Sequence, residues 1–169
     1  IRLLFLSFVQ VLAAIAVSAR FGFTQQEAAD ALADFTGVEM RLQDEQIGTL
    51  RFINDAYNAN PGSMIAAAAV LAECPGRKVF IAGNMLELGD QSEDIHMQTG
   101  REIAARGVNM VIGVGELGTV LAKGAGKMGA ETHCFAGVDE ASKAIIPLLR
   151  AGDAILIKGS RAMGMERLI

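Results

Sequence analysis

The sequence predicts an α/β fold, namely a Rossmann-like, mainly parallel sheet with helices on both faces, preceded by a helical segment. Two observations support this fold class. Short apolar runs alternate with helical patterns over residues 44–169, as they do in βαβ units. The runs at 79–82, 110–112 and 154–157 are continuously apolar, which is typical of strands that are buried on both faces.

Composition narrows the class of protein further. The 169 residues carry a net charge of −4, which argues against nucleic acid as a partner. A hydrophobic content of 51% excludes a disordered chain. Cys74 and Cys134 are the only cysteines, so neither a disulfide framework nor a four-cysteine zinc site is possible. We expect no metal site, since no H-x-x-x-H or C-x-x-C spacing occurs.

Residues 1–43 form a separate segment with an apolar start. Residues 1–19 suggest a membrane span or a secretory signal, but the run is short and polar residues interrupt it. Thr24 and Glu27 have the spacing of a capping box. We therefore predict two packed helices at 1–20 and 24–36, and no membrane span. The first helix would be buried in a domain whose other parts this sequence lacks.

The elements of residues 44–169 follow from periodicity and from helix-start signals. Asn60 before Pro61 marks the start of one helix, and Asp139 is expected to cap another. The predicted strands are 49–54, 78–82, 109–112, about 131–135 and 153–158. The predicted helices are 62–73, 92–105, 116–123 and 140–150, with a terminal helix near Ser160.

Polar residues gather after the predicted strands, where ligands bind in sheets of this kind. Carboxylates suit ribose hydroxyls, amides suit bases and phosphates, and cations suit a carboxylate or phosphate. The structural alternative is that these residues only form turns and helix-start salt bridges. The residues are Asp55, Tyr57, Asn58, Asn60, Asn84, Glu87, Asp90, Glu116, Lys158, Ser160 and Arg161.

Three further features are interpreted as structural. Residues 113–118 match G-x-G-x-x-G, but they follow the third strand and not the first, so a structural turn is favoured over a dinucleotide site. His96 is expected on a solvated helix face, and Cys134 in a buried strand. No P-loop motif occurs in the sequence.

Three blocks together resemble the Mur ligase family, and within it the UDP-N-acetylmuramoyl-tripeptide–D-alanyl-D-alanine ligases. They are INDAYNANPGSM at 53–64, GNMLELG at 83–89 with His96 downstream, and KGSR at 158–161 followed by Met165 and Glu166. The resemblance covers roughly residues 20–169. Asn84 departs from the family, which usually has Asp there, and residues 1–12 lack the family's G-x-H-N stretch.

The resemblance implies part of a cytoplasmic, ATP-dependent amide ligase of peptidoglycan synthesis. ATP would phosphorylate the carboxylate of UDP-N-acetylmuramoyl-tripeptide, and the amine of D-alanyl-D-alanine would attack the acyl phosphate. Residues 1–43 would be the helical tail of the central ATPase domain, and 44–169 the C-terminal domain. ATP and Mg²⁺ would be held mainly by the missing central domain, so we expect the isolated chain to be inactive, without catalytic or metal-binding residues of its own.

The resemblance also assigns site residues. The nucleotide-binding set would be Arg41, Asp55, Tyr57, Asn58 and Asn60, with Arg41 reaching toward phosphate. Lys158, Ser160 and Arg161 would lie near the incoming dipeptide. Two alternatives remain open, namely a non-catalytic Rossmann-like nucleotide-binding module and a Mur ligase with a different amino-acid substrate.

Overall fold

A computed structural model describes residues 8–34 and 38–169, and residues 1–7 and 35–37 lie outside the description. The predicted helices at 1–20 and 24–36 can therefore be compared with the structure only in part. The chain divides into two compact units, Ile1–Val38 and Glu39–Ile169.

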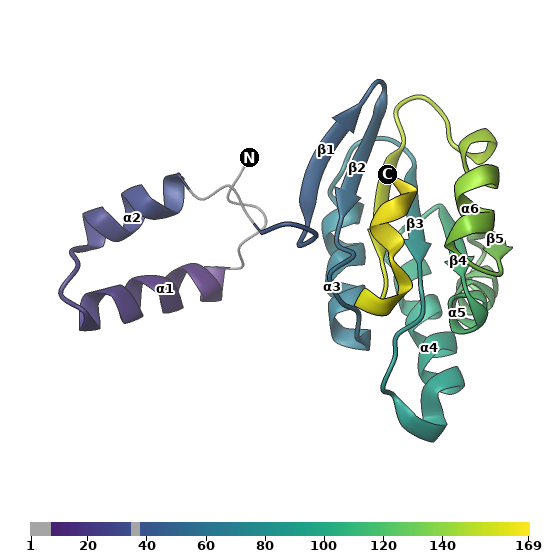
Figure 1. The fold of residues 1–169 in the computed structure, drawn as a ribbon, viewed down its shortest axis with the longest axis horizontal. Helices are drawn as coiled ribbons and strands as arrows, with labels where there is room; N and C mark the ends of the chain where they lie inside the picture. Colours follow the sequence, from purple (N-terminus) through teal and green to yellow (C-terminus); the bar gives the residue numbers. More distant parts are fainter. Residues whose placement is uncertain (1–7, 35–37) are drawn as a thin grey trace. The chain divides into compact units, whose positions relative to one another are not determined.

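The first unit is a pair of helices in contact, α1 (Phe8–Arg20) and α2 (Gln25–Ala33) (Figure 1). The predicted capping box is confirmed, because Thr24 Oγ1 accepts the Glu27 N–H at 3.2 Å and Glu27 Oε2 accepts the Thr24 N–H at 2.8 Å. Leu12 and Val17 are exposed, so the described residues do not supply the burial that we expect for α1. Over the described ranges, each helix is too short or too polar to span a bilayer.

The second unit contains a six-stranded sheet in the order β1-β2-β6-β3-β4-β5. All neighbouring pairs are parallel except β1 and β2, which are antiparallel. The predicted fold class is thereby confirmed. The strands are β1 (Gln43–Ile47), β2 (Leu50–Asn54), β3 (Lys78–Ala82), β4 (Met110–Val114), β5 (Glu131–Phe135) and β6 (Ala154–Lys158).

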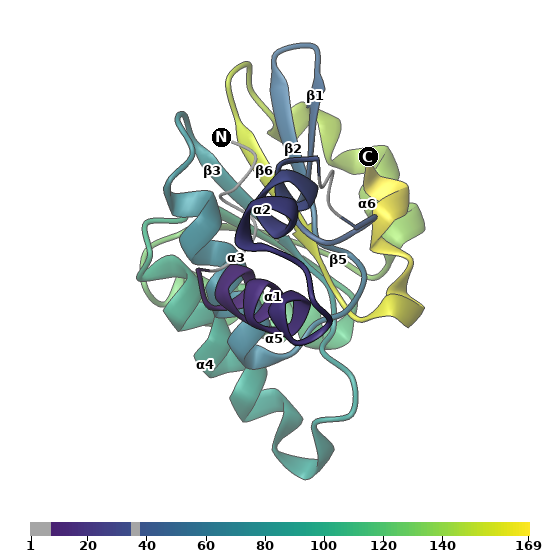
Figure 2. The ribbon, with the colours of Figure 1, turned by 90° about the vertical axis from the view of Figure 1, so that its left-hand side faces the viewer.

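Helical layers cover both faces of this sheet (Figures 1 and 2). Side chains of α3 (Pro61–Ala72), α4 (Ser92–Ala104) and α5 (Glu116–Gly126) share one buried cluster with one face of the strands. The opposite face packs against α6 (Val138–Ala144) and the 3-10 segment η5 (Met165–Leu168). The buried helix α3 begins at Pro61 with Asn60 as its N-cap, as predicted.

Four sequence expectations differ from the structure. The edge strand β1 is not predicted, because QDEQI is polar and exposed throughout and shows no alternation. The helix expected at 140–150 is α6, whose N-cap is Gly137 and not Asp139; it is followed by the 3-10 turn η3 (Ile146–Leu148), which contains Pro147. Two 3-10 segments, η4 (Arg161–Met163) and η5, replace the terminal helix. Cys134 is exposed on the edge strand β5, not buried.

The helices α4 and α5 pack backbone against backbone through two glycines. A Cβ atom on Gly100 would lie 1.9 Å from the carbonyl oxygen of Leu121, and one on Gly124 would lie 2.1 Å from the carbonyl oxygen of Met97. Real Cβ contacts are never this short, so neither position has room for a side chain. The layer on this face of the sheet depends on that close approach.

We predict that Gly100→Ala lowers the free energy of unfolding by about 3 kcal/mol or more, because the helices must separate to admit one methyl group. Gly62→Ala is the matched control. It also lies in a helix, but its Cβ atom would meet only Asn60 Oδ1 at 3.6 Å, so helix propensity should leave stability unchanged or raised by up to about 1 kcal/mol. Urea unfolding followed by circular dichroism measures both variants. Equal losses of stability in the two variants would show that the contact between α4 and α5 tolerates a side chain at Gly100.

Candidate functional site at the carboxyl edge of the sheet

The carboxyl ends of β2, β6 and β3 are neighbours, because these three strands are adjacent in the sheet. The loops that follow them therefore lie side by side. We call residues 55–60, 83–88 and 158–161 the carboxyl-edge site. It brings together most of the residues that the sequence analysis selects, since only Arg41, Asp90 and Glu116 lie outside these loops.

The buried side chain of Lys158 links the end of β6 to the loop after β2. Its ammonium nitrogen lies 2.6 Å from Asp55 Oδ2, 2.8 Å from the carbonyl oxygen of Asn58 and 3.4 Å from the carbonyl oxygen of Asp55. Lys158 is only 3% exposed. Burial raises the pKa of the Asp55 carboxyl, and the Lys158 ammonium and the Leu42 N–H oppose the rise. All three hydrogen-bond acceptors of the ammonium group belong to the loop after β2.

The segment 40–42 is fastened to the same loop. Asp55 Oδ1 accepts the N–H of Leu42 at 3.1 Å, and the carbonyl oxygen of Met40 accepts the N–H of Tyr57 at 3.1 Å. Met40 and Leu42 have φ angles of 55° and 52°, a strained region for side-chain-bearing residues. Between them, the Arg41 guanidinium lies 4.3 Å from the centre of the Tyr57 ring. These contacts hold an exposed cation over an exposed aromatic ring.

Asn58 and Asn60 are anchored by their oxygens. Asn58 Oδ1 accepts the N–H of Ala59 at 2.9 Å, and Asn60 Oδ1 accepts the N–H of Ser63 at 2.8 Å. Both residues are exposed, and within the described ranges neither amide nitrogen donates a hydrogen bond. Each side chain therefore presents a fixed NH₂ donor, which suits an acceptor such as a phosphate oxygen or a base nitrogen.

Ser160 and Asn84 connect the loops after β6 and β3. Ser160 Oγ accepts the N–H of Leu86, and the carbonyl oxygen of Asn84 accepts the N–H of Ser160, both at 2.9 Å. Asn84 Oδ1 accepts the N–H of Gly118 in the first turn of α5 at 2.9 Å. This contact requires only an oxygen acceptor. Asparagine therefore makes it as well as the aspartate that usually stands at this position in the family that the sequence resembles.

His96 is buried, so the expectation that it lies on a solvated helix face is wrong. Its exposed fraction is 0%. Nε2 accepts the N–H of Met85 at 2.8 Å, and Nδ1–H donates to the carbonyl oxygen of Ser92 at 2.6 Å. Helical periodicity alone does not reveal this contact, because the partner lies in the preceding loop. His96 thereby positions the loop after β3.

The G-x-G-x-x-G stretch has a packing explanation. A Cβ atom on Gly113 would lie 2.3 Å from the carbonyl oxygen of Gly118, and one on Gly118 would lie 2.6 Å from the carbonyl oxygen of Ala82. Gly115 has a φ of 84°. Strand and helix thus meet at van der Waals distance, and Asn84 occupies the N–H of Gly118 that a phosphate would need. The structural-turn interpretation accounts for all three glycines.

Arg161 is the exposed cation of the last loop. Its side chain is 54% exposed, and Nη1 lies 2.7 Å from Glu166 Oε1 and 3.2 Å from Met40 Sδ. Of the three cations selected from the sequence, Arg41 and Arg161 therefore face solvent and Lys158 does not.

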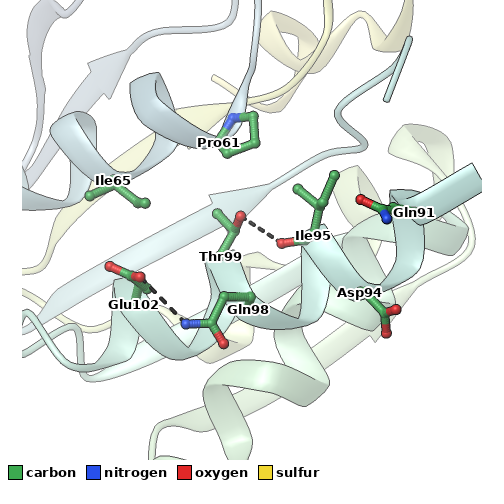
Figure 3. Close-up of a pocket in the computed structure, with 8 residues that line it drawn as sticks. All are labelled: Pro61, Ile65, Gln91, Asp94, Ile95, Gln98, Thr99 and Glu102. Atoms are coloured by element: carbon green, nitrogen blue, oxygen red, sulfur yellow. Dashed lines mark hydrogen bonds between the residues drawn. The ribbon is translucent and has the colours of Figure 1, made fainter. Parts of the chain in front are cut away.

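Two further features bear on ligands. Across the described ranges, no group of three acidic, histidine or cysteine side chains is arranged to hold a metal ion. An open groove of about 440 Å³ runs between α3 and α4, and none of its lining residues is a predicted site residue (Figure 3). Its lining residues are Pro61, Ile65, Gln91, Asp94, Ile95, Gln98, Thr99 and Glu102.

Loops that meet at the carboxyl edge of a mainly parallel sheet form the kind of site at which α/β domains bind their ligands. Residues 40–161 match the family described as Mur ligase, glutamate ligase domain. This chain belongs to the Mur ligase family.

Relatives and solved structures agree with the family match. The UDP-N-acetylmuramoyl-tripeptide–D-alanyl-D-alanine ligases of Escherichia coli and Bacillus subtilis are 37% and 36% identical, each over 94% of this chain and 35% and 36% of their own length. A crystal structure of MurF from Acinetobacter baumannii superposes with a TM-score of 0.86 at 34% identity, over 94% of this chain and 36% of that one. MurF from Thermotoga maritima in complex with ADP, at 24% identity and a TM-score of 0.77, shares the fold over 95% of this chain and 36% of that one.

This chain therefore spans about a third of the length of the curated relatives that it matches.

We predict that Lys158→Met lowers the free energy of unfolding by about 3–5 kcal/mol, because it leaves the Asp55 carboxylate without its cation in a buried position. Asp55→Asn in the same chain should recover much of the loss, since it removes the unpaired charge. Urea unfolding of the two single variants and the double variant measures the coupling. Additive losses would show that the two groups do not depend on each other.

We predict that stability falls as the pH drops below about 6.5, because burial lowers the pKa of His96 and only the hydrogen bond to Ser92 opposes this shift. Below this pH, His96 binds a proton in the unfolded chain but stays neutral in the folded chain until the pH is lower. The contribution is complete above the unfolded pKa and is lost as the pH falls through the folded one, with a slope of up to about 1.4 kcal/mol per pH unit.

The matched control for this pH effect is the second histidine. Unfolding of wild type, His96→Gln and His133→Gln is measured between pH 5 and 8. His96→Gln should reduce the slope by more than His133→Gln does, because only His96 is fully buried. An unchanged slope in His96→Gln would contradict the assignment.

Proposed function

We propose that this chain is the C-terminal part of an ATP-dependent ligase that adds D-alanyl-D-alanine to UDP-N-acetylmuramoyl-tripeptide in cytoplasmic peptidoglycan synthesis. The observation that carries the proposal is the similarity to ligases of that name over 94% of the chain. The three motif loops of that resemblance also meet at one edge of the sheet, which is where an α/β sheet binds its ligands.

The loop after β2 supplies the groups for a nucleotide. The Tyr57 ring, 45% exposed beneath Arg41, offers an aromatic surface and a cation to a base or phosphate. The NH₂ groups of Asn58 and Asn60 offer two donors. Asp55 keeps this loop in shape through Lys158 and Leu42, and its remaining lone pairs suit a ribose hydroxyl.

The loop after β6 supplies the groups for the dipeptide. Arg161 is the exposed cation for its carboxylate, because a guanidinium matches a carboxylate in two hydrogen bonds. Ser160 orients this loop through its contacts with Asn84 and Leu86. Lys158 lies beneath both loops and joins the nucleotide half of the site to the dipeptide half.

The proposed reaction has two steps. The terminal carboxylate of the tripeptide takes the γ-phosphoryl group of ATP and ADP leaves. The free amine of the dipeptide then attacks the acyl phosphate, and the amide bond forms as phosphate and a proton are released. Mg²⁺ would neutralise charge during phosphoryl transfer. The described residues lack a cluster for that ion, so its ligands would come from the central ATPase domain, which would also include residues 1–43. The role of this chain is to bind and orient substrates.

We predict that the isolated chain releases no phosphate above background from ATP, tripeptide and dipeptide. A chimera that joins it to the part of the Escherichia coli relative preceding the matched region should release phosphate in strict dependence on all three substrates. A malachite-green assay with mass spectrometry of the product measures both. Phosphate release by the isolated chain would contradict the expected inactivity.

Two other outcomes would favour the alternatives. A chimera that accepts a different amino acid in place of D-alanyl-D-alanine would point to another Mur ligase specificity. A non-catalytic module would leave the chimera inactive, and NAD, but not ATP, would raise the melting temperature of the chain.

A further inference from the structure

The loop after β3 carries a carboxylate that nothing in the fold explains. Glu87 has a φ of 65°, although it is not a glycine. Its side chain is exposed, and over the described ranges it makes neither a hydrogen bond nor an ion pair. A strained backbone at an exposed, unpaired side chain gives no structural benefit, and such positions cluster where a ligand is bound.

The unusual backbone is fixed by the residues before Glu87. Met85 donates its N–H to the buried imidazole of His96 at 2.8 Å, and Leu86 donates its N–H to Ser160 Oγ at 2.9 Å. Ser160 in turn donates its own N–H to the carbonyl oxygen of Asn84. The chain is therefore fixed up to the residue before Glu87, by α4 on one side and by the loop after β6 on the other, and these contacts set the position of the Glu87 backbone.

Glu87 and Arg161 flank the same contact. Leu86 touches Ser160, and Glu87 and Arg161 each follow one residue later. Since consecutive Cα atoms are about 3.8 Å apart, the exposed carboxylate of Glu87 and the exposed guanidinium of Arg161, which is paired with Glu166, each stand one residue beyond the contact between the two loops. Leu86, which is 42% exposed, adds an apolar surface beside them.

We propose that Glu87 binds the ammonium group of the incoming dipeptide, whose carboxylate is bound by Arg161. This inference rests on the proposed function. A free dipeptide is a zwitterion whose ends lie about 7 Å apart when extended, so its recognition needs one group of each sign at a fixed separation. One methyl group of D-alanyl-D-alanine would pack on Leu86, because successive side chains of an extended peptide point to opposite sides. Glu87 thus selects a ligand with a free amine.

The test uses the ligating chimera. Glu87→Gln should raise KM for D-alanyl-D-alanine about tenfold or more and leave KM for ATP and for the tripeptide unchanged. N-acetyl-D-alanyl-D-alanine has no ammonium group, so its inhibition constant should not change. Glu87→Asp should restore part of the affinity. Glu93→Gln is the matched control, because Glu93 is an exposed carboxylate in the first turn of α4 and its removal should change none of these constants.

A second measurement does not require turnover. Titration calorimetry of the 169-residue chain should show that the free dipeptide binds at least tenfold more tightly than its N-acetyl form, and that Glu87→Gln abolishes the difference. Equal binding of the two peptides by wild type, or an unchanged difference in Glu87→Gln, would overturn the inference. A chimera that ligates while Glu87→Gln behaves as wild type overturns the inference alone, whereas a chimera without ligation counts against the proposed function.

Discussion

The contact between Lys158 and Asp55 is the interaction on which the carboxyl-edge site depends. It joins the ends of two neighbouring parallel strands, since Asn54 pairs with Ile157 just before them. A buried ion pair is costly to desolvate and is kept where hydrogen bonds satisfy both partners. Here Lys158 meets three acceptors, and Asp55 meets Lys158 and Leu42. The shape of the loop after β2 and the course of the chain leading into the sheet thus follow from one charged contact.

Both ends of strand β6 are fixed by ion pairs that include a buried charged side chain. Before its first residue, Asp153 Oδ2 lies 2.7 Å from Arg77 Nη2. Burial alone would raise the pKa of Asp153, but hydrogen bonds from Arg77 and from the N–H of Arg150 hold it below its ordinary value. At the other end, Lys158 and Ser160 bind the loops on either side. A central strand with fixed ends gives those loops a rigid origin, which a site made of loops requires.

Much of this arrangement is predictable, because buried strands and helix starts have recognisable local sequence patterns. Continuous apolar runs located the inner strands, and Asn60–Pro61 located the start of α3. The strand order has no such local pattern, so sequence alone could not show that three loops meet. The buried contact of His96 is hidden from the sequence because its partner Met85 lies in the preceding loop, and the strand β1 is hidden because its residues are polar and exposed throughout. Lys158 stands out in the sequence as a cation at the end of a buried strand, but its burial can be read only from the fold.

The antiparallel edge strand decides where the two ends of the first hairpin lie. Gln43 pairs with Asn54, and Ile47 pairs with Leu50, so the chain enters the sheet beside the carboxyl-edge site and turns at the opposite edge. The turn at Gly48 is open, with no atom within 4 Å of a Cβ placed there. A fluorophore attached at the neighbouring exposed Thr49 would therefore report on the sheet without touching a ligand, whereas one attached at Glu39 would sit next to Met40, which contacts Tyr57.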